Sequence, residues 1–118
     1  MKKTLVLGAS LKSERYSNRA IFQLIQNGHK VVAVGNKEGV AHGVQIRKNL
    51  PEKDIDTVTI YLGKSNQIPY YDQLLRLHPR RIIFNPGAEN SELSALAKAK
   101  GIECLEACTL VMLSIGNY

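Results

Sequence analysis

The stretch with the most evident chemistry is residues 5–20, LVLGASLKSERYSNRA. An apolar run stops at Gly8-Ala9-Ser10, a mostly polar loop follows, and an amphipathic segment begins near Ser17. This order predicts a buried strand, a tight turn, a loop of phosphate size and the start of a helix. In α/β sheets the first such connection binds nucleotide diphosphates, because free N–H groups and the positive end of the helix dipole face the anion. The stretch therefore predicts a nucleotide-like ligand.

The end of the second predicted strand narrows the choice of nucleotide. The dinucleotide fingerprint G-x-G-x-x-G is absent, no G-K-[ST] follows Gly8, and no acidic residue ends this strand. Asn36 and Lys37 stand there instead. A lysine attracts a ribose phosphate that a carboxylate would repel, so the pair favours NADP or coenzyme A. Lys12, Arg15 and Arg19 add positive charge near the expected diphosphate.

Strand and helix patterns alternate along the chain. Strands are predicted over residues 2–7, 30–34, 56–62, 81–84 and 102–105, and helices over 19–27, 66–77 and 91–100. The first helix has Ser17 or Asn18 as its candidate N-cap and Gly28 as its stop, and Pro69 lies in the first turn of the second. Residues 38–54 are predicted to be irregular, with a short helix near 47–50, and 109–116 to pack as a last helix or turn. The alternation predicts an α/β fold with a five-stranded, mostly parallel sheet covered by helices on both faces.

Ligands of such sheets bind at the carboxyl ends of the strands. Small, polar and cationic residues gather at four of these ends: Gly8, Ala9, Ser10 and the loop to Ser17; Gly35, Asn36 and Lys37; Tyr61, Leu62, Gly63 and Lys64; and Asn85, Pro86, Gly87, Ala88 and Glu89. Loops in general favour Gly, Asn and Pro. The coincidence of four such loops at one edge nevertheless indicates a binding site.

Length and charge limit the class of protein. With 118 residues, one domain spanning residues 1–118 is expected, and the formal charge of +6 suits an anionic ligand of any kind. No apolar run approaches the length of a membrane span, and the basic start is interpreted as part of the first strand, so we expect a cytoplasmic protein. Cys104 and Cys108 are interpreted as free thiols, and no cluster of ligands indicates a metal site.

Five pieces carry a resemblance to a known family: VLGAS–SERYSNRA, VVAVGNK, TIYL, FNPGAEN and GIECLEACTLVML, in this order over nearly the whole chain. The chain resembles the small single-domain CoA-binding proteins, relatives of the CoA-binding domain of the succinyl-CoA synthetase α subunit. The resemblance implies a three-layer Rossmann-like fold that binds coenzyme A or an acyl-CoA at the strand ends. The segment PGAEN fits the small proteins better than the synthetase, whose phosphorylated histidine belongs to a second domain.

The resemblance also implies roles for individual residues. Gly8, Ala9, Ser10, Arg15 and Ser17 would hold the diphosphate, and Gly35, Asn36 and Lys37 would lie by the adenosine and its phosphate. Tyr61 and Leu62 would line the path of the adenine or the pantetheine, and Asn85, Pro86 and Gly87 would close the site.

The sequence shows no set of nucleophile, base and orienting residue. His29, His42 and His78 are scattered, and His42, in the segment AHG, is interpreted as a solvated loop histidine. We therefore expect CoA binding without catalysis, and no nucleic-acid or membrane partner. An NADP-binding reductase-like domain is the first alternative. A basic nucleic-acid-binding module is the second, although the seven aromatic residues form no evident stacking surface.

Overall fold

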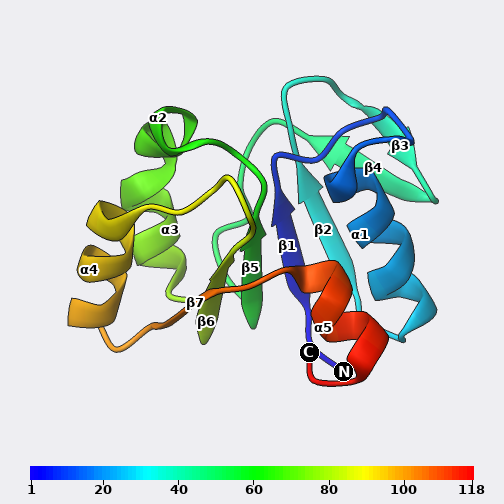
Figure 1. The fold of residues 1–118 in the computed structure, drawn as a ribbon. Coiled ribbons are helices and arrows are strands. Elements are labelled where there is room, and N and C mark those ends of the chain that lie inside the picture. The colour runs from blue at the N-terminus through cyan, green and yellow to red at the C-terminus, as the bar shows by residue number, and fades with distance from the viewer.

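A computed structural model describes residues 1–118 as one twisted sheet with helices on both faces (Figure 1). Its strands are β1 (Thr4–Leu7), β2 (Val31–Val34), β3 (Gly39–Ala41), β4 (Val44–Arg47), β5 (Thr57–Ile60), β6 (Arg81–Phe84) and β7 (Glu103–Glu106), in the order β3-β4-β2-β1-β5-β6-β7. All neighbouring pairs are parallel except β3 and β4. The predicted Rossmann-like α/β class is confirmed, but the sheet has seven strands rather than five.

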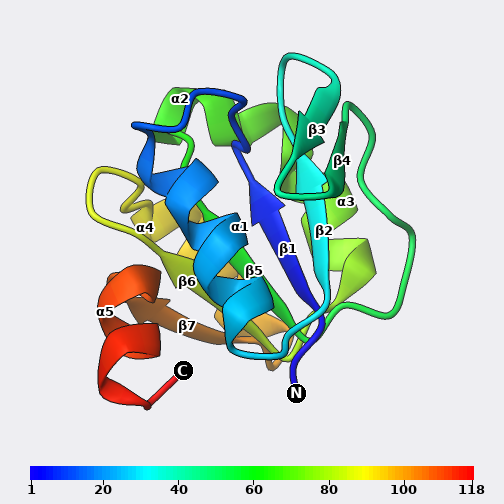
Figure 2. The ribbon, with the colours of Figure 1, turned by 90° about the vertical axis from the view of Figure 1, so that its right-hand side faces the viewer.

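The helices divide between the two faces of the sheet, as Figures 1 and 2 show together. The helical elements are α1 (Tyr16–Gln26), α2 (Lys64–Gln67), the 3₁₀ turn η1 (Ile68–Tyr70), α3 (Tyr71–Leu77), α4 (Ser91–Ala99) and α5 (Thr109–Ile115). Leu74 of α3 and Leu93 of α4 pack in one apolar cluster with Leu5 and Leu7 of β1. On the other face, α1 and α5 pack on Val6. Because successive side chains of a strand alternate, β1 is buried on both faces.

The two additional strands form a hairpin in the segment predicted to be irregular. β3 and β4 pair in antiparallel fashion around His42 and Gly43, whose φ angles are 52° and 82°. Two successive positive φ angles are typical of the tight turns that join hairpin strands. Ile46 of β4 is fully buried beside Ala33 of β2, so the predicted short helix near 47–50 is wrong.

Two helix boundaries also differ from the prediction. The helix predicted over 66–77 is divided into α2, η1 and α3, and Pro69 lies within η1 rather than in a first α-helical turn. Arg15, not Ser17 or Asn18, is the N-cap of α1, so those two side chains lie inside the first turn. Gly28 adopts a φ of 83° just beyond the end of α1, as a C-terminal stop requires. None of the helices has the length and apolar character to cross a lipid bilayer.

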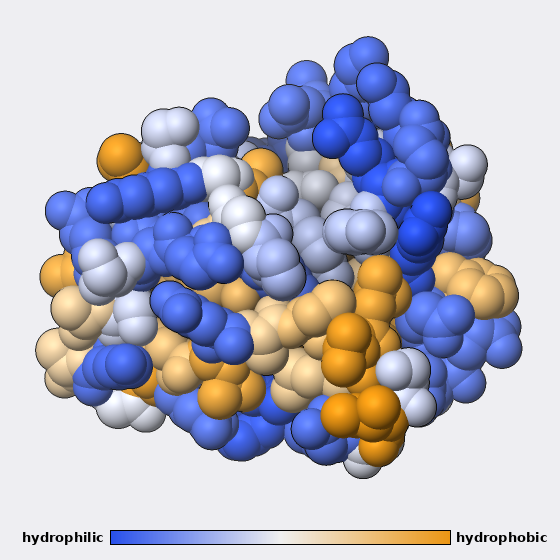
Figure 3. All heavy atoms as spheres, viewed as in Figure 1, coloured by the Kyte–Doolittle hydropathy of each residue, from blue (hydrophilic) through white to orange (hydrophobic).

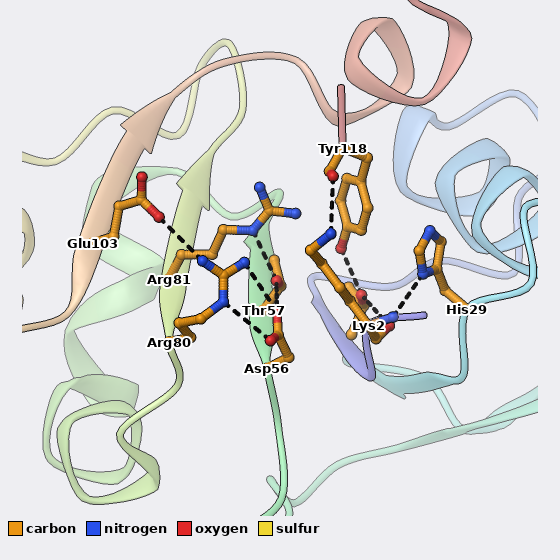
Figure 4. A network of polar contacts seen from close by, with 9 residues as sticks. Lys2, His29, Asp56, Thr57, Arg80, Arg81, Glu103 and Tyr118 are labelled. Carbon is orange, nitrogen blue, oxygen red and sulfur yellow. Dashed lines mark hydrogen bonds and ion pairs between the residues drawn. The ribbon is translucent and has the colours of Figure 1, made fainter. Parts of the chain in front are cut away.

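The amino ends of the strands carry a network of polar contacts (Figure 4). Arg81 is 5% exposed, donates through Nε to Thr57 Oγ1 at 2.9 Å, and stacks its guanidinium 4.5 Å from the centre of the Tyr118 ring. Lys2 Nζ donates to the Tyr118 carbonyl at 3.1 Å, which joins residues near the two ends of the chain at this edge. Nearby, Arg80 pairs with Asp56 at 3.1 Å. These contacts tie residues near both ends of the chain to the amino ends of β5 and β6.

Candidate functional site

A cavity of about 710 Å³ lies at the carboxyl edge, across the ends of β2, β1, β5 and β6. It brings together most of the predicted site residues, namely Gly8, Ala9, Ser10, Arg15, Ser17, Asn36, Lys37, Tyr61, Leu62 and Pro86. Leu11, Lys12, Glu14 and Tyr16 complete its lining. Gly35, Asn85 and Gly87 do not line it. The space-filling view shows mostly hydrophilic residues over this upper edge and apolar residues over α5 (Figure 3).

The connection after β1 holds its shape by internal hydrogen bonds. The N–H groups of Gly8 and Ala9 both donate to the Val34 carbonyl at 2.9 Å, and Gly8 has a φ of 96°. These two amides are therefore engaged within the protein. At the start of α1, the N–H groups of Tyr16 and Ser17 have no acceptor in the protein, and Arg15 supplies no side-chain cap. Free amides at the N-terminus of an 11-residue helix whose first residues line a cavity suit an anionic ligand.

Gly35 lies directly against the backbone of the loop that follows β1. A Cβ atom at this position would lie 2.2 Å from the Ala9 carbonyl oxygen, far inside van der Waals contact. The Gly35 N–H donates to the Arg47 carbonyl at 2.9 Å, which fixes the backbone that follows β2. Gly35 therefore permits the close approach of two strand ends, while its neighbours Asn36 and Lys37 line the cavity.

The β3–β4 hairpin also contacts this loop, through Asn18. The Asn18 side chain is 4% exposed, and its Nδ2 donates to the Ser10 carbonyl at 2.9 Å. Its Oδ1 accepts from His42 Nε2 at 2.7 Å. The prediction of a solvated loop histidine is thus wrong in part. His42 is exposed, but its ring is hydrogen-bonded to the Asn18 side chain, which in turn is bonded to the loop after β1.

Charge is distributed unequally along the cavity. Lys12, Arg15 and Lys37 line it near the ends of β1 and β2, and Glu14 is the one acidic residue of the lining. Both ion pairs of the protein involve Arg80, so the three lining cations have no carboxylate partner. The lining residues after β5 and β6 are uncharged. The cavity is therefore cationic at one end and neutral at the other.

Tyr61 forms part of the neutral end. Its hydroxyl is buried without a hydrogen-bond partner, beside the pair formed by Thr59 and Thr109, whose Oγ1 atoms lie 2.7 Å apart. Burial raises the pKa of Tyr61 to about 12, because the charged phenolate would lose its hydration. The side chain is thus neutral over the physiological range of pH.

Asn85 and Gly87 support the loop after β6 from within. The Asn85 Nδ2 donates to Thr59 Oγ1 at 2.7 Å and to the Ile60 carbonyl at 2.9 Å, and its Oδ1 accepts from the Thr109 N–H at 2.9 Å. Gly87 has a φ of 92° in a turn that the Ala88 N–H closes by donating to the Asn85 carbonyl at 2.8 Å. These two residues place Pro86 at the cavity without lining it.

Other chemically capable residues lie apart from one another. No group of three or more His, Cys, Asp and Glu side chains is placed to hold a metal ion. Cys104 and Cys108 are free thiols, both half-buried. His29 lies at the amino edge, where it accepts from the Lys2 N–H at 2.9 Å, and His78 ends α3, where its Nε2 contacts the Lys100 carbonyl at 2.8 Å. None of the cavity lining pairs a nucleophile with a base.

Comparisons with known proteins point to one family. The profile of the family described as CoA binding domain matches residues 2–114. A crystal structure of a protein described as uncharacterized is 44% identical, covers 100% of this chain and 98% of its own, and superposes with a TM-score of 0.97. No curated protein matches the chain.

More distant structures share the fold. A hypothetical protein from Pyrococcus horikoshii OT3 is 24% identical with a TM-score of 0.85, covering 97% of this chain and 82% of its own. The dinucleotide forming acetyl-coenzyme A synthetase 1 of Ca. Korarchaeum cryptofilum, in complex with phosphate and ADP, is 16% identical with a TM-score of 0.68. That match covers 89% of this chain and 25% of the synthetase.

Proposed function

This chain belongs to the CoA-binding domain family, and we propose that it binds coenzyme A, free or as an acyl-CoA, in the cavity at the carboxyl edge of the sheet. The observation that carries the proposal is the division of the cavity into a cationic end and a neutral end. Coenzyme A has the matching division, with a triply phosphorylated nucleotide at one end and an uncharged pantetheine arm at the other.

In this proposal the nucleotide half lies over β1 and β2. The free N–H groups of Tyr16 and Ser17 face the diphosphate, and Lys12 and Arg15 neutralise its charge. Lys37 follows β2 and meets the 3′-phosphate of the ribose. Charge-assisted hydrogen bonds of this kind are worth about 1.5–3 kcal/mol each, so three free cations offer substantial affinity.

The pantetheine arm then runs over the ends of β5 and β6. Tyr61, Leu62 and Pro86 line this end of the cavity and offer the arm an uncharged surface. The lining holds no nucleophile beside a base, so the role proposed for this cavity is ligand binding.

Thermal unfolding in the presence of single ligands tests the proposal. A ligand at 100 times its Kd stabilises the folded state by about 2.7 kcal/mol, which shifts the Tm by several degrees. We expect CoA to raise the Tm and NADP to raise it much less. An equal or larger shift with NADP would favour the reductase-like alternative, and no shift with either would contradict the proposal. Native mass spectrometry of the purified protein then identifies any acyl group that is retained.

A further inference from the structure

Two buried amide side chains, Gln67 and Asn90, lie beneath the neutral end of the cavity. Gln67 is fully buried and Asn90 is 2% exposed, and neither lines the cavity. Gln67 ends α2, and Asn90 precedes α4 as its N-cap. Amides are rarely this buried unless every polar atom has a partner. Because neither side chain can touch a ligand in the cavity, we expect the pair to act through hydrogen bonds within the protein.

Gln67 connects the loop after β5 to the loop after β6. Its Nε2 donates to the Leu62 carbonyl at 2.9 Å and to the Ala88 carbonyl at 2.7 Å. Its Oε1 accepts from Asn90 Nδ2 at 2.9 Å, which fixes the orientation of the amide. Leu62 lines the cavity itself, and Ala88 closes the turn that places Pro86 there.

The rest of the network holds Asn90. Its Nδ2 also donates to the Tyr71 hydroxyl at 2.8 Å, and its Oδ1 accepts from the Leu93 N–H at 3.1 Å. The Tyr71 hydroxyl in turn donates to Glu92 Oε1 at 2.9 Å, at the surface. Each donor and acceptor of the two amides is thus satisfied, and the network runs from the surface to the two loop carbonyls.

The parallel pairing of β5 with β6 ends before these loops. The last paired residues are Ile60 and Phe84, and Asn85 donates to the Ile60 carbonyl through both its backbone N–H, at 3.3 Å, and its Nδ2, at 2.9 Å. Beyond that point, Gln67 supplies the hydrogen bonds that join the two loops. Gln67 is therefore the side chain that hydrogen-bonds to both loops past the strand ends.

We propose that Gln67 is a positioning residue that sets the separation of the loops after β5 and β6, and thereby the shape of the end of the cavity that receives the non-nucleotide arm of the ligand. The inference rests on the proposed function for the identity of that ligand. It predicts that Gln67 affects the arm and not the nucleotide, because the cationic end lies over β1 and β2, away from these loops.

The test compares two ligands on two variants. Coenzyme A has both halves, whereas adenosine 3′,5′-bisphosphate keeps the adenosine, the 3′-phosphate and the first 5′-phosphate and lacks the pantetheine arm. Gln67→Met keeps the length of the side chain and removes its hydrogen bonds. Tyr71→Phe is the matched control, since it breaks the outer part of the same network and leaves both loop carbonyls bonded to Gln67. Isothermal titration calorimetry measures each Kd.

We expect Gln67→Met to weaken CoA binding about tenfold, because the two loops would then have to be ordered on binding instead of being held in place beforehand. Binding of adenosine 3′,5′-bisphosphate should change by less than about twofold, as for a surface substitution. Tyr71→Phe should change neither affinity by more than that. An equal loss for both ligands, or an unchanged affinity for CoA, would overturn the positioning role. If the wild-type protein bound neither ligand, the proposed function itself would fail.

A measurement on the wild-type protein covers the case in which Gln67→Met does not fold. The side-chain amide of Gln67 has its own NMR signals, and these report the loop carbonyls to which it donates. We expect CoA to shift them and adenosine 3′,5′-bisphosphate to leave them in place. Equal shifts with both ligands, or none with CoA, would overturn the inference.

Discussion

Gly35→Ala changes the site by adding a single methyl group behind the loop. The added Cβ would lie 2.2 Å from the Ala9 carbonyl oxygen, whereas real Cβ contacts essentially never fall below 3.0 Å. The Ala9 backbone must therefore move by about 0.8 Å or more, the difference between these two distances. It cannot move freely, because the Ala9 N–H is bonded to the Val34 carbonyl at 2.9 Å.

Overpacking of this kind costs about 1–3 kcal/mol of stability. Because the displaced backbone carries the start of the ligand loop, we expect a loss of CoA affinity of similar size, about tenfold to a hundredfold. Calorimetric titration measures the affinity, and urea unfolding measures the stability.

Gly63→Ala is the matched control at the same edge of the sheet. Gly63 has an ordinary φ of −64°, and nothing lies within 4 Å of its added Cβ. This variant should keep its affinity for CoA and change the stability by less than about 0.5 kcal/mol, because the freedom lost by the unfolded chain is offset by the poorer N-cap of α2. Wild-type affinity in Gly35→Ala would refute the inferred coupling between Gly35 and the loop, whatever its stability.

Three further substitutions test separate parts of the site. Ser10→Asp should abolish CoA binding with an unchanged circular dichroism spectrum, because a carboxylate at the cavity repels the diphosphate. The uncharged control Ser10→Asn should still bind CoA. Retained binding in Ser10→Asp would place the diphosphate elsewhere. Lys37→Ala should erase most of the preference for CoA over 3′-dephospho-CoA, about tenfold to a hundredfold, and an undiminished preference would remove Lys37 from the phosphate contact. Tyr61 has a folded pKa of about 12 against about 10 when unfolded, so its contribution to stability is complete below pH 10 and is lost as the pH rises toward 12. Chemical unfolding at pH 9 and pH 11.5 should therefore show a smaller decline for Tyr61→Phe than for the wild-type protein, and equal declines would contradict the burial of this hydroxyl.

The strand ends could be predicted from the sequence because their signals are local. Gly8 follows an apolar run directly, and Lys37 follows the next, so their meeting at one edge requires only that the strands be parallel. The residue types do not indicate which backbone N–H groups and side-chain amides remain free to bind a ligand. Gly8 and Ala9 use their amides within the protein, and Asn85 turns its amide to the backbone.

The parts that were missed depend on contacts between distant residues. The hairpin turn contains a histidine in the left-handed region, where glycine or asparagine would have been the usual signal. Asn18 and His42 are 24 residues apart, and Gln67 and Ala88 are 21 apart, so neither hydrogen bond follows from a local pattern. A fully buried glutamine in a short helix looks the same in sequence as a solvated one.

A crystal structure of the protein grown with coenzyme A would decide whether and where the ligand binds. We expect the diphosphate within hydrogen-bond distance of the Tyr16 and Ser17 N–H groups, with the 3′-phosphate beside Lys37 and the pantetheine arm along Leu62 and Pro86. Clear density for the ligand away from the carboxyl edge, such as in the hollow of about 380 Å³ between α1 and α5, would contradict the proposed site. So would an empty cavity at a CoA concentration that saturates the thermal shift.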